Sequence, residues 1–359
     1  MNKIREPRQI DFFIALMKDP DRKSLFRIVY ESFILLFYYK EIPVHYFSRY
    51  LFKNYITNFR DYLPNKFIEK RIASFFNDKS VKDVLDDKLF FDFFYSRFNI
   101  ALPKTHMFNN KNMFVMGRKS ISVNNANEFK ILLEEIYRQN SSYDSIFIKK
   151  TNSSSSGNNI HKLFLHEFQE DTEKINELYS EVSQSEYLFQ ETVKQHPDIN
   201  VLNPSSLNTI RIDTFIDSNG KIEVISAHIR MSINNLHVDN IGSGGCYVGI
   251  NLQTGKLKKY GYSTIDIIGV KVLTEHPLTK TVFENFRIPF IPQVIELVIK
   301  AAGYMPGLRL VGWDVAIGES GPVLIEGNSD YEIRGNDAAS GGYLANPTFR
   351  KVLHEINYL

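Results

Sequence analysis

The sequence has very little cysteine and no long apolar run, and each absence narrows its class. Cys246 is the only cysteine in 359 residues, which excludes an intrachain disulfide framework and fits a reducing compartment. The nearest candidate for a membrane span, FILLFYY at 33–39, is far shorter than the roughly 18 apolar residues that a spanning helix needs. The start, MNKIREPRQIDFF, lacks the charged-then-apolar order of a secretory signal. We therefore expect a soluble, cytoplasmic protein.

A strong charge of either sign is also missing. The net charge is +2, which carries no signature of nucleic-acid binding. The charge is unevenly placed, because residues 1–75 hold 14 Lys and Arg against 8 Asp and Glu, an excess of +6 that leaves −4 for the remainder. Two interpretations stay open. The start is a helical region with a solvated basic rim, or it faces an anionic membrane or polymer, peripherally at the inner membrane face.

The first hundred residues contain a helical pattern of aromatic residues. Phe26, Tyr30, Phe33 and Phe37 recur at helical spacing, and we expect this stripe to face a core.

From about residue 100 the sequence mixes strand-like and helical segments. Helices are expected near 171–185 and 289–303, and the turn sequences SNG, QTG and GESG predict hairpins. The clearest strand-like segments are SIFIKK (145–150), YLFQETV (187–193), SLNTIRIDTFID (206–217) and KIEVISAHIRMSI (221–233). Strands and helices do not alternate regularly, so an α+β fold is expected and not a doubly wound sheet.

The stretch VGWDVAIGESGPVLIEGN, residues 311–328, is the most informative. It places Asp314 in one apolar run, and Glu326 and Asn328 in the next. Residues two apart share a strand face, and a short turn pairs the two strands antiparallel, so the three side chains can meet. Such oxygen donors suit Mg²⁺. The alternative is that the carboxylates are exposed on a one-sided sheet. We favour the metal site because buried carboxylates need a cation partner.

A second set of candidates surrounds FIKK, residues 147–150. A lysine that ends a buried strand can reach nucleotide phosphates, and because successive strand residues alternate in direction, only one of Lys149 and Lys150 faces a pocket; we choose Lys149. The following SSSSG turn, with Ser155 and Ser156, can fold over phosphates through its N–H groups and hydroxyls. The spacing of a Walker loop is missing.

The order of these motifs resembles the ATP-grasp superfamily, and within it the enzymes associated with sugar transfer and surface-polysaccharide genes. The resemblance covers roughly residues 102–343 and is carried by five segments: FIKK, YLFQETVKQH, SLNTIRIDTF, HVDNIGSGGCYVGINLQTG and GWDVAIGESGPVLIEGN. It implies an α+β ATP-grasp fold with the nucleotide between two lobes, preceded by a helical N-terminal region. The implied parts are 1–100, 101–190 and 191–359.

The resemblance also implies roles for individual positions. Lys149, Ser155 and Ser156 would contact the phosphates, and Gln190, Glu191 and Val193 would read the adenine edge, largely through the backbone of Glu191 and Val193. Asp314, Glu326 and Asn328 would hold one or two Mg²⁺ ions. Arg211 and Arg230 would clamp the γ-phosphate and an acyl phosphate.

Four further interpretations concern the arginines, the segment DNIGSGG, Cys246 and the histidines. The arginines have an alternative role as cross-strand partners of Asp213 and Glu223, but both lie in apolar surroundings. In DNIGSGG, residues 239–245, the glycines permit close approach of a ligand, or form a tight connection. The substrate candidates there are Asp239, Asn240, Gly244 and Gly245. Cys246 is expected to be a packed residue, and no histidine is expected to be the base.

The implied activity is an ATP- and Mg²⁺-dependent carboxylate–amine ligase. It forms an acyl phosphate and attaches an amine or amino acid to a uronic-acid sugar of a surface polysaccharide or its precursor. The alternative is an ATP-binding module of a polysaccharide-biosynthesis assembly that no longer ligates.

Overall fold

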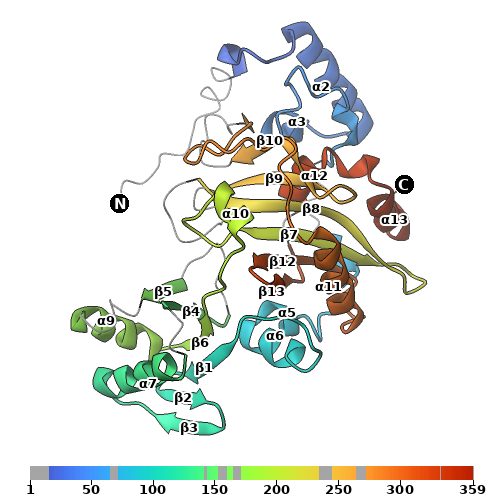
Figure 1. Ribbon diagram of the computed structural model, residues 1–359. Helices are drawn as coiled ribbons and strands as arrows, with labels where there is room; N and C mark the ends of the chain where they lie inside the picture. The colour runs from blue at the N-terminus through green and yellow to red at the C-terminus, as the bar shows by residue number, and fades with distance from the viewer. Residues whose placement is uncertain are drawn as a thin grey trace.

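The computed structural model describes residues 16–64, 72–140, 144–152, 160–164, 171–233, 245–263, 272–331 and 333–358. These residues form two antiparallel sheets with helices packed on them, so the expected α+β class is confirmed (Figure 1). Within these ranges, every helix is too short or too polar to cross a membrane.

The smaller sheet has the strand order β3-β2-β1-β6-β4-β5. Its strands are β1 (Thr105–Asn110), β2 (Met113–Met116), β3 (Lys119–Ser122), β4 (Ser145–Lys150), β5 (Ile160–Phe164) and β6 (Glu186–Glu191). Helices α7 (Ala126–Gln139) and α9 (Thr172–Val182) share a core with one face of this sheet, through residues such as Ile146 and Ile148. Strand alternation therefore places Phe147 and Lys149 on the opposite face.

The larger sheet has the order β11-β10-β9-β8-β7-β12-β13. Its strands are β7 (Thr209–Ile216), β8 (Ile222–Ser232), β9 (Gly245–Asn251), β10 (Lys256–Ser263), β11 (Val272–Leu273), β12 (Leu310–Gly318) and β13 (Gly321–Asn328). Helix α11 (Ile291–Gly303) packs on one face, where Trp313 and Val315 are fully buried. The hairpins predicted at SNG, QTG and GESG are confirmed as β7–β8, β9–β10 and β12–β13.

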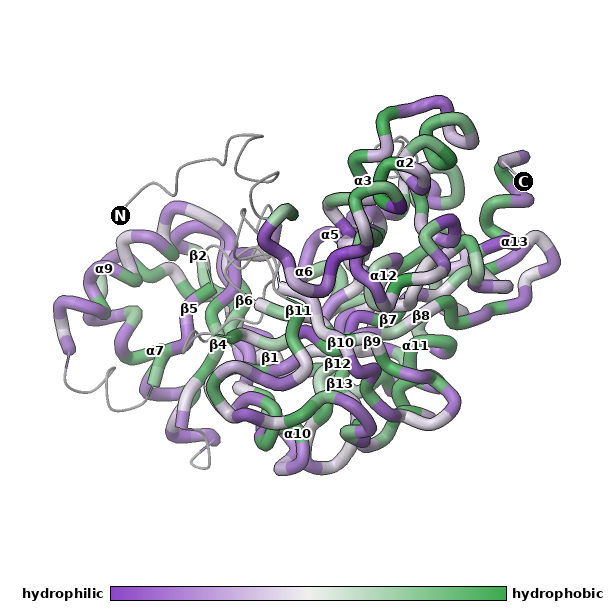
Figure 2. Tube along the Cα trace, turned by 90° about the horizontal axis from the view of Figure 1, so that it is seen from above, coloured by the Kyte–Doolittle hydropathy of each residue, from purple (hydrophilic) through white to green (hydrophobic). Residues whose placement is uncertain are grey.

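The remaining helices lie at the N-terminus, between the sheets and at the C-terminus. They are α2 (Leu25–Tyr39), α3 (Val44–Ser48), α5 (Asp83–Asp86), α6 (Lys88–Tyr95), α10 (Pro197–Leu202), α12 (Ile333–Ser340) and α13 (Pro347–Glu355), with short 3-10 turns at Phe59–Asp61, Ile72–Phe75 and Tyr343–Ala345. The hydropathy tube shows apolar segments along α2 and α3, at a distance from the smaller sheet (Figure 2).

The prediction that the aromatic stripe of α2 faces a core is wrong. Phe26, Phe33 and Phe37 are 83%, 54% and 76% exposed, and Tyr30 is 58% exposed. The helix is apolar on nearly every side, so spacing alone does not select its inner face. A polar group does: Glu31 is buried and accepts hydrogen bonds from the Lys23 Nζ at 2.6 Å and the Tyr46 hydroxyl at 2.7 Å. The inner face is therefore Ile28, Glu31, Leu35 and Tyr39.

A buried ion pair joins the N-terminal helices to the rest of the chain. Arg49, which ends α3, pairs with Asp337 of α12, and both side chains are almost fully buried. Asn336, the residue before Asp337 in α12, donates through its amide to Asp213 on β7 at 2.6 Å. The N-terminal region is thus fastened to the larger sheet through polar groups as well as through its apolar core.

We predict that Arg49→Met destabilises the protein by about 3 to 5 kcal/mol, because it leaves the Asp337 carboxylate buried without its cation. Urea unfolding followed by circular dichroism measures the free energy. Lys280→Met is the control, since Lys280 pairs with Glu275 on the surface at 3.5 Å and its loss should cost under about 1 kcal/mol. Equal effects of the two substitutions would contradict this role of Arg49.

Candidate functional site

The β12–β13 hairpin brings together the three predicted metal ligands. Asp314 is the direct cross-strand partner of Glu326, and Gly312 is the partner of Asn328. Asp314 is buried, whereas the Glu326 side chain is 30% exposed and Asn328 is half-buried. The expectation that Asp314 and Glu326 are neighbours across a hairpin is confirmed, and the alternative of an exposed Asp314 is wrong.

A β-bulge decides which way Glu326 faces. Val315 pairs with Leu324 and Asp314 pairs with Glu326, so Ile325 is the extra residue. Without the bulge, Glu326 would share the face of Leu324, which lies in the core; with it, Glu326 joins the face of Asp314. Gly327 then faces the core, where a Cβ atom would lie 3.0 Å from Leu85 and from the Trp313 ring. In the sequence EGN, the two polar residues therefore lie on the face of Asp314, and the glycine between them lies on the core face.

Two arginines from neighbouring strands surround Asp314. The Arg211 Nε and Nη2 donate to its two carboxylate oxygens at 2.6 and 3.0 Å, and the Arg230 Nη2 lies 2.8 Å from the second oxygen. Arg230 also donates to the Thr209 hydroxyl at 2.9 and 3.1 Å. The arginines are therefore not partners of Asp213 and Glu223, as one interpretation of the sequence had it. They form one positive cluster around Asp314.

Burial and charge act in opposite directions on these groups. Burial alone would raise the pKa of Asp314, but Arg211 and Arg230 outweigh it and hold this pKa well below its usual range. Burial and the neighbouring Asp314 charge raise the pKa of Glu326. The site thus contains one carboxylate that is firmly ionised and a second that takes up a proton more readily.

The donor set fits Mg²⁺. Two carboxylates and one amide oxygen on a shared face are hard ligands of the kind that this ion takes together with phosphates. Among the described residues, no group of three or more His, Cys, Asp and Glu side chains is arranged to hold a metal ion, so the amide of Asn328 is needed for a third ligand. Because both oxygens of Asp314 already accept from arginines, an ion here would share Asp314 with Arg211 and rely more on Glu326.

Helix α6 contributes two charged residues that the sequence analysis missed. The Lys88 Nζ lies 3.8 Å from the Glu326 carboxylate, and the Lys88 N–H donates to the Thr151 carbonyl just beyond β4 at 2.9 Å. One turn further, the buried Asp92 accepts from the Thr105 hydroxyl at 2.9 Å. The one available signal was Lys88 itself, because a cation in the first turn of a helix opposes the helix dipole.

The smaller sheet supplies Lys149 on the face that points away from α7 and α9. Its Nζ donates to the Gln190 Oε1 at 3.2 Å, and the Gln190 amide nitrogen lies 3.2 Å from the Thr105 hydroxyl and 3.5 Å from Asp92. Lys150 points to the other face, as strand alternation requires. Burial raises the pKa of Asp92, and the Lys149 charge is among the groups that oppose this rise.

The end of β6 borders a cavity of about 150 Å³. Its lining includes Phe147, Lys162 and Val193, together with residues of the segment that leads into β7. The Glu191 N–H already donates to the Lys104 carbonyl at 2.9 Å, and its carboxylate accepts from the Lys104 N–H. Val193 forms no backbone hydrogen bond to another described residue. Of the two backbone positions predicted to read an adenine, Val193 is therefore the more available donor.

His228 and Asp213 lie on the same face of the larger sheet as the arginines. His228 is the cross-strand partner of Arg211 and is buried, with no hydrogen-bond partner at its Nδ1 among the described residues. Burial and the two arginine charges hold its pKa well below the usual value, so it is neutral. Burial raises the pKa of Asp213 to about 6, although it accepts from Ser226, Asn336 and Tyr343. In the sequence, the two-residue spacing of His228 and Arg230 was the feature that could have placed His228 on the same strand face as this arginine.

Several predicted site residues carry no structural description. Ser155 and Ser156 lie outside the described residues, as do Asp239, Asn240 and Gly244. Gly245 begins β9, pairs with Ser232, and accepts the Ser263 hydroxyl at 3.2 Å. Cys246 is fully buried, as expected of a packed residue, and burial raises the pKa of its thiol to about 12.

We predict that the His228 imidazole does not titrate between about pH 5 and 8 in the folded protein, because protonation would bury a third cation beside Arg211 and Arg230. Nitrogen-15 NMR of the ring measures this directly. In the unfolded chain the same ring should titrate near its ordinary pKa of about 6.5. His228 therefore reduces stability as the pH falls below that value, and a folded-state titration near neutrality would contradict the assignment.

A family profile described as sugar-transfer associated ATP-grasp matches residues 68–348. No curated protein matches the sequence. Among solved structures, the chain is similar to a D-cycloserine synthetase, with 11% identity and a TM-score of 0.46 over 81% of this chain and 78% of that one.

The chain is also similar to D-alanyl-alanine synthetase A from Vibrio cholerae, with 12% identity and a TM-score of 0.44 over 76% of this chain and 65% of that one. A third similar structure is a biotin carboxylase from Campylobacter jejuni in its beta-gamma-ATP complex, with 13% identity and a TM-score of 0.42 over 76% and 47%. The chain thus spans less than two thirds of these last two proteins. The family profile covers most of the chain and confirms the resemblance of the motifs: the protein belongs to the sugar-transfer-associated ATP-grasp family.

Proposed function

We propose that this protein is an ATP- and Mg²⁺-dependent carboxylate–amine ligase that works through an acyl phosphate. The observation that carries the proposal is the cluster of Asp314, Glu326, Arg211 and Arg230 on one sheet face, within a chain of the ATP-grasp family. We further propose that the acid is a uronic-acid sugar of a surface polysaccharide or its precursor, and that the amine is an amino acid or small amine. The family description supports the sugar, and the cytoplasm is the proposed place of action.

The three parts of the chain receive separate roles in this proposal. Residues 1–100 form an N-terminal region, 101–190 a first nucleotide-binding lobe and 191–359 a second lobe with the metal and substrate site. Lys149 would bind the phosphates, and the cavity beside Phe147 and Val193 would hold the adenine. Ser155, Ser156, Asp239, Asn240 and Gly244 keep their proposed roles at the phosphates and at the substrate.

The reaction brings anions together, and the cationic residues suit that task. An oxygen of the substrate carboxylate attacks the γ-phosphorus of ATP, the bond from that phosphorus to the bridging oxygen breaks, and ADP leaves with the electron pair. Arg211 and Arg230 would hold the transferred phosphoryl group, and Lys149 the phosphates of ADP. Mg²⁺ bound by Asp314, Glu326 and Asn328 would neutralise phosphate charge. The amine nitrogen then attacks the acyl carbon, phosphate leaves, and the nitrogen gives up a proton.

Charge balance in the structure supports this use of the arginines. In the chain alone, Asp314 neutralises part of the charge on Arg211 and Arg230. A cation on the carboxylate face would compete for Asp314 and leave more of the guanidinium charge for an anionic ligand. Lys88, whose Nζ lies 3.8 Å from the Glu326 carboxylate, would add a further positive charge for an anionic ligand.

A second candidate function is a nucleotide-binding module without ligase activity. The observation that favours it is the engagement of both Asp314 oxygens by arginine, which leaves the metal fewer open positions. Such a module would bind ATP and leave it intact.

We expect Glu326→Gln to lower the rate of ADP formation by about 100-fold or more, because the site loses a charged ligand of the metal. Coupled-enzyme detection of ADP measures the rate, with ATP, Mg²⁺, a uronic-acid panel and pooled amino acids. Hydroxylamine in place of the amine should trap the acyl phosphate as a hydroxamate. Glu319→Gln, in the exposed turn of the same hairpin, is the matched control and should keep full activity. Intact ATP under all conditions would favour the binding module.

We expect Lys149→Met to weaken ATP binding by about 10- to 100-fold, since it removes a charged hydrogen-bond donor to phosphate. Isothermal titration calorimetry with ATP and Mg²⁺ gives the dissociation constant. Lys150→Met is the control because it changes the adjacent lysine on the opposite face of β4, and it should leave the constant within about threefold. A larger loss of ATP affinity in Lys150→Met than in Lys149→Met would show that Lys150, and not Lys149, faces the nucleotide.

A further inference from the structure

The outer side of α2 is an exposed apolar surface, which we call the α2 face. It consists of Leu25, Phe26, Val29, Tyr30, Phe33, Leu36, Phe37 and Tyr38. Each of these side chains is at least 37% exposed, with Leu36 the least and Phe26 the most. Ile42 and Val44, just beyond the helix, are 76% and 50% exposed and extend the surface. A contiguous apolar surface of this kind marks an interaction site and not an ordinary solvated helix.

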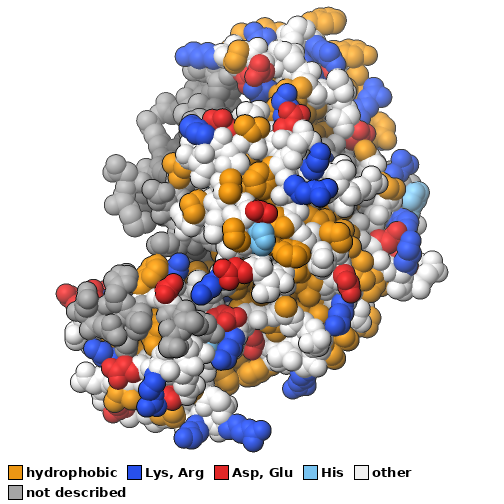
Figure 3. Space-filling view, in the orientation of Figure 1, with side chains coloured by type: hydrophobic (Ala, Val, Ile, Leu, Met, Phe, Trp, Pro, Cys, Tyr) orange, Lys and Arg blue, Asp and Glu red, His pale blue; other side chains and the backbone are white. Residues whose placement is uncertain are grey.

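The exposed charges around the α2 face are mainly basic. Within residues 16–64, all of which the structure describes, Lys18, Arg27, Lys40 and Arg60 are exposed, against a single exposed acid, Asp21. The one acidic residue in α2, Glu31, is buried and bound to Lys23, Arg27 and Tyr46. In the space-filling view, hydrophobic side chains and Lys or Arg, with some Asp or Glu among them, are seen at the end of the molecule that holds α2 (Figure 3). The surface therefore complements an anionic partner.

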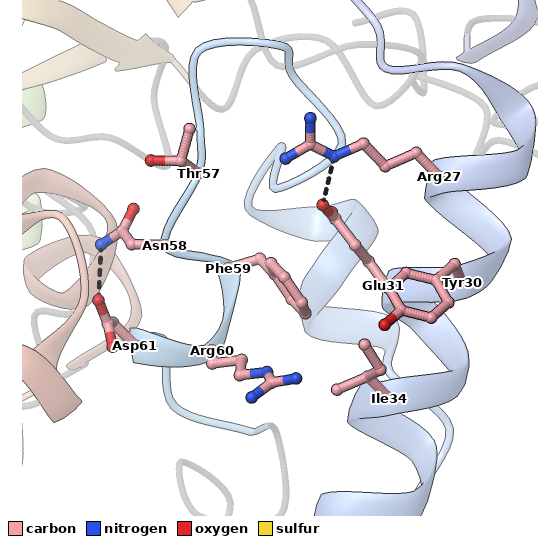
Figure 4. Close-up of a pocket in the computed structure, with 9 residues that line it drawn as sticks. All are labelled: Arg27, Tyr30, Glu31, Ile34, Thr57, Asn58, Phe59, Arg60 and Asp61. Carbon is pink, nitrogen blue, oxygen red and sulfur yellow. Dashed lines mark hydrogen bonds and ion pairs between the residues drawn. The ribbon is translucent and has the colours of Figure 1, made fainter.

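A pocket with two guanidinium groups adjoins this surface. It has a volume of about 420 Å³ and lies between α2 and the segment 57–61 (Figure 4). Arg27 donates through its Nε to Glu31 at 2.8 Å, which leaves its two terminal nitrogens directed away from that carboxylate. Arg60 lies over the Phe59 ring at 5.7 Å. Asp61, also in the lining, accepts from the Asn58 amide at 3.0 Å.

We propose that the α2 face is a membrane-docking surface that lies in the headgroup region of a bilayer rich in anionic phospholipid, with lipid phosphate at the pocket between Arg27 and Arg60. Aromatic side chains beside basic residues are the composition of helices that lie in the membrane interface. At 15 residues, α2 is too short to span the bilayer.

A second copy of this chain fits the surface less well. A two-fold symmetric contact would place the basic rim against itself, with like charges opposed at close range. An anionic bilayer neutralises the same charges. The orientation also leaves room for the candidate site, because α2 lies at the end of the molecule away from the smaller sheet (Figure 1). The inference rests on the N-terminal region and not on the ligase reaction.

Cosedimentation of the full chain with lipid vesicles tests the proposal. The protein should sediment with vesicles of equal parts phosphatidylcholine and phosphatidylglycerol, and about tenfold more weakly with phosphatidylcholine alone. Replacement of three exposed aromatic residues should weaken binding to the mixed vesicles by about tenfold or more: Phe26→Ser, Phe33→Ser and Phe37→Ser. Lys40→Gln and Arg60→Gln should each cost about fivefold.

The matched control removes three exposed apolar residues elsewhere and should bind like the unchanged protein: Ile131→Ser, Leu278→Ser and Val282→Ser, at positions that are 61%, 49% and 57% exposed. Binding by the aromatic variant that equals wild type would overturn the proposal, as would failure of the wild type to sediment with mixed vesicles. Sedimentation velocity provides another decisive outcome, because a dimer that the aromatic variant dissociates would make the α2 face a protein interface.

A second measurement keeps the test independent of the triple variant's stability. Phe33→Trp places an indole on the α2 face, and brominated phospholipid in the mixed vesicles should quench its emission. The native Trp313 is fully buried and donates to the Thr214 hydroxyl at 2.8 Å, so it provides an unquenched reference. Emission from position 33 that brominated lipid leaves unchanged would overturn the proposal.

Discussion

The site depends on the compensation of one buried carboxylate. Asp314 lies in a sheet whose opposite face is a dense apolar core, and an unpaired charge there would be costly. The compensation comes from Arg211 on β7 and Arg230 on β8, so three strands must be in the right register at once. A slip of one residue would send Asp314 or an arginine into the core face. The charge cluster therefore helps to specify the sheet, and the same residues are the ones proposed to handle phosphate.

Helix α6 contacts both sheets through charged side chains. Lys88 approaches Glu326 on the larger sheet, and Asp92, on the same side of the helix, is bonded to Thr105 beside Gln190 on the smaller sheet. The asparagine and aspartate groups that precede α6 add to this, since Asp86 accepts from Ser329 and Asn77 donates to its carbonyl. The short helix thus connects the lysine proposed to bind phosphate with the ligands proposed to bind metal.

The sequence was sufficient for those features that depend on neighbours along the chain. Turn residues predicted the hairpins, and strand alternation predicted that Lys149 and Lys150 lie on opposite faces of their strand. The apolar residues around Asp314 predicted its burial. It was insufficient where the outcome depends on contacts across the fold. The bulge at Ile325 follows from a conflict between the core position of Leu324 and the charge of Glu326, and spacing showed only that Glu326 and Asn328 share a face.

The stripe of α2 failed for a related reason. A helix that is apolar on nearly all sides has no face that periodicity can select, and the buried Glu31 with its partner Lys23 decided the matter. Lys88 and His228 could also be recognised only from the fold, because each lies beside a site residue that is far away in the chain. The family resemblance, in contrast, rested on the local motifs and was confirmed.

The polar contacts that link the N-terminal helices to the sheet have a geometric consequence. Glu31 joins α2 to α3 through Tyr46, Arg49 joins α3 to α12, and Asn336 joins α12 to β7, two residues from Arg211. Buried hydrogen bonds and ion pairs restrain the elements that they join more strongly than a flexible linker would. These contacts link the outermost helix to the charged cluster around Asp314, so the proposed docking of α2 on a bilayer would set the distance of that cluster from the membrane surface.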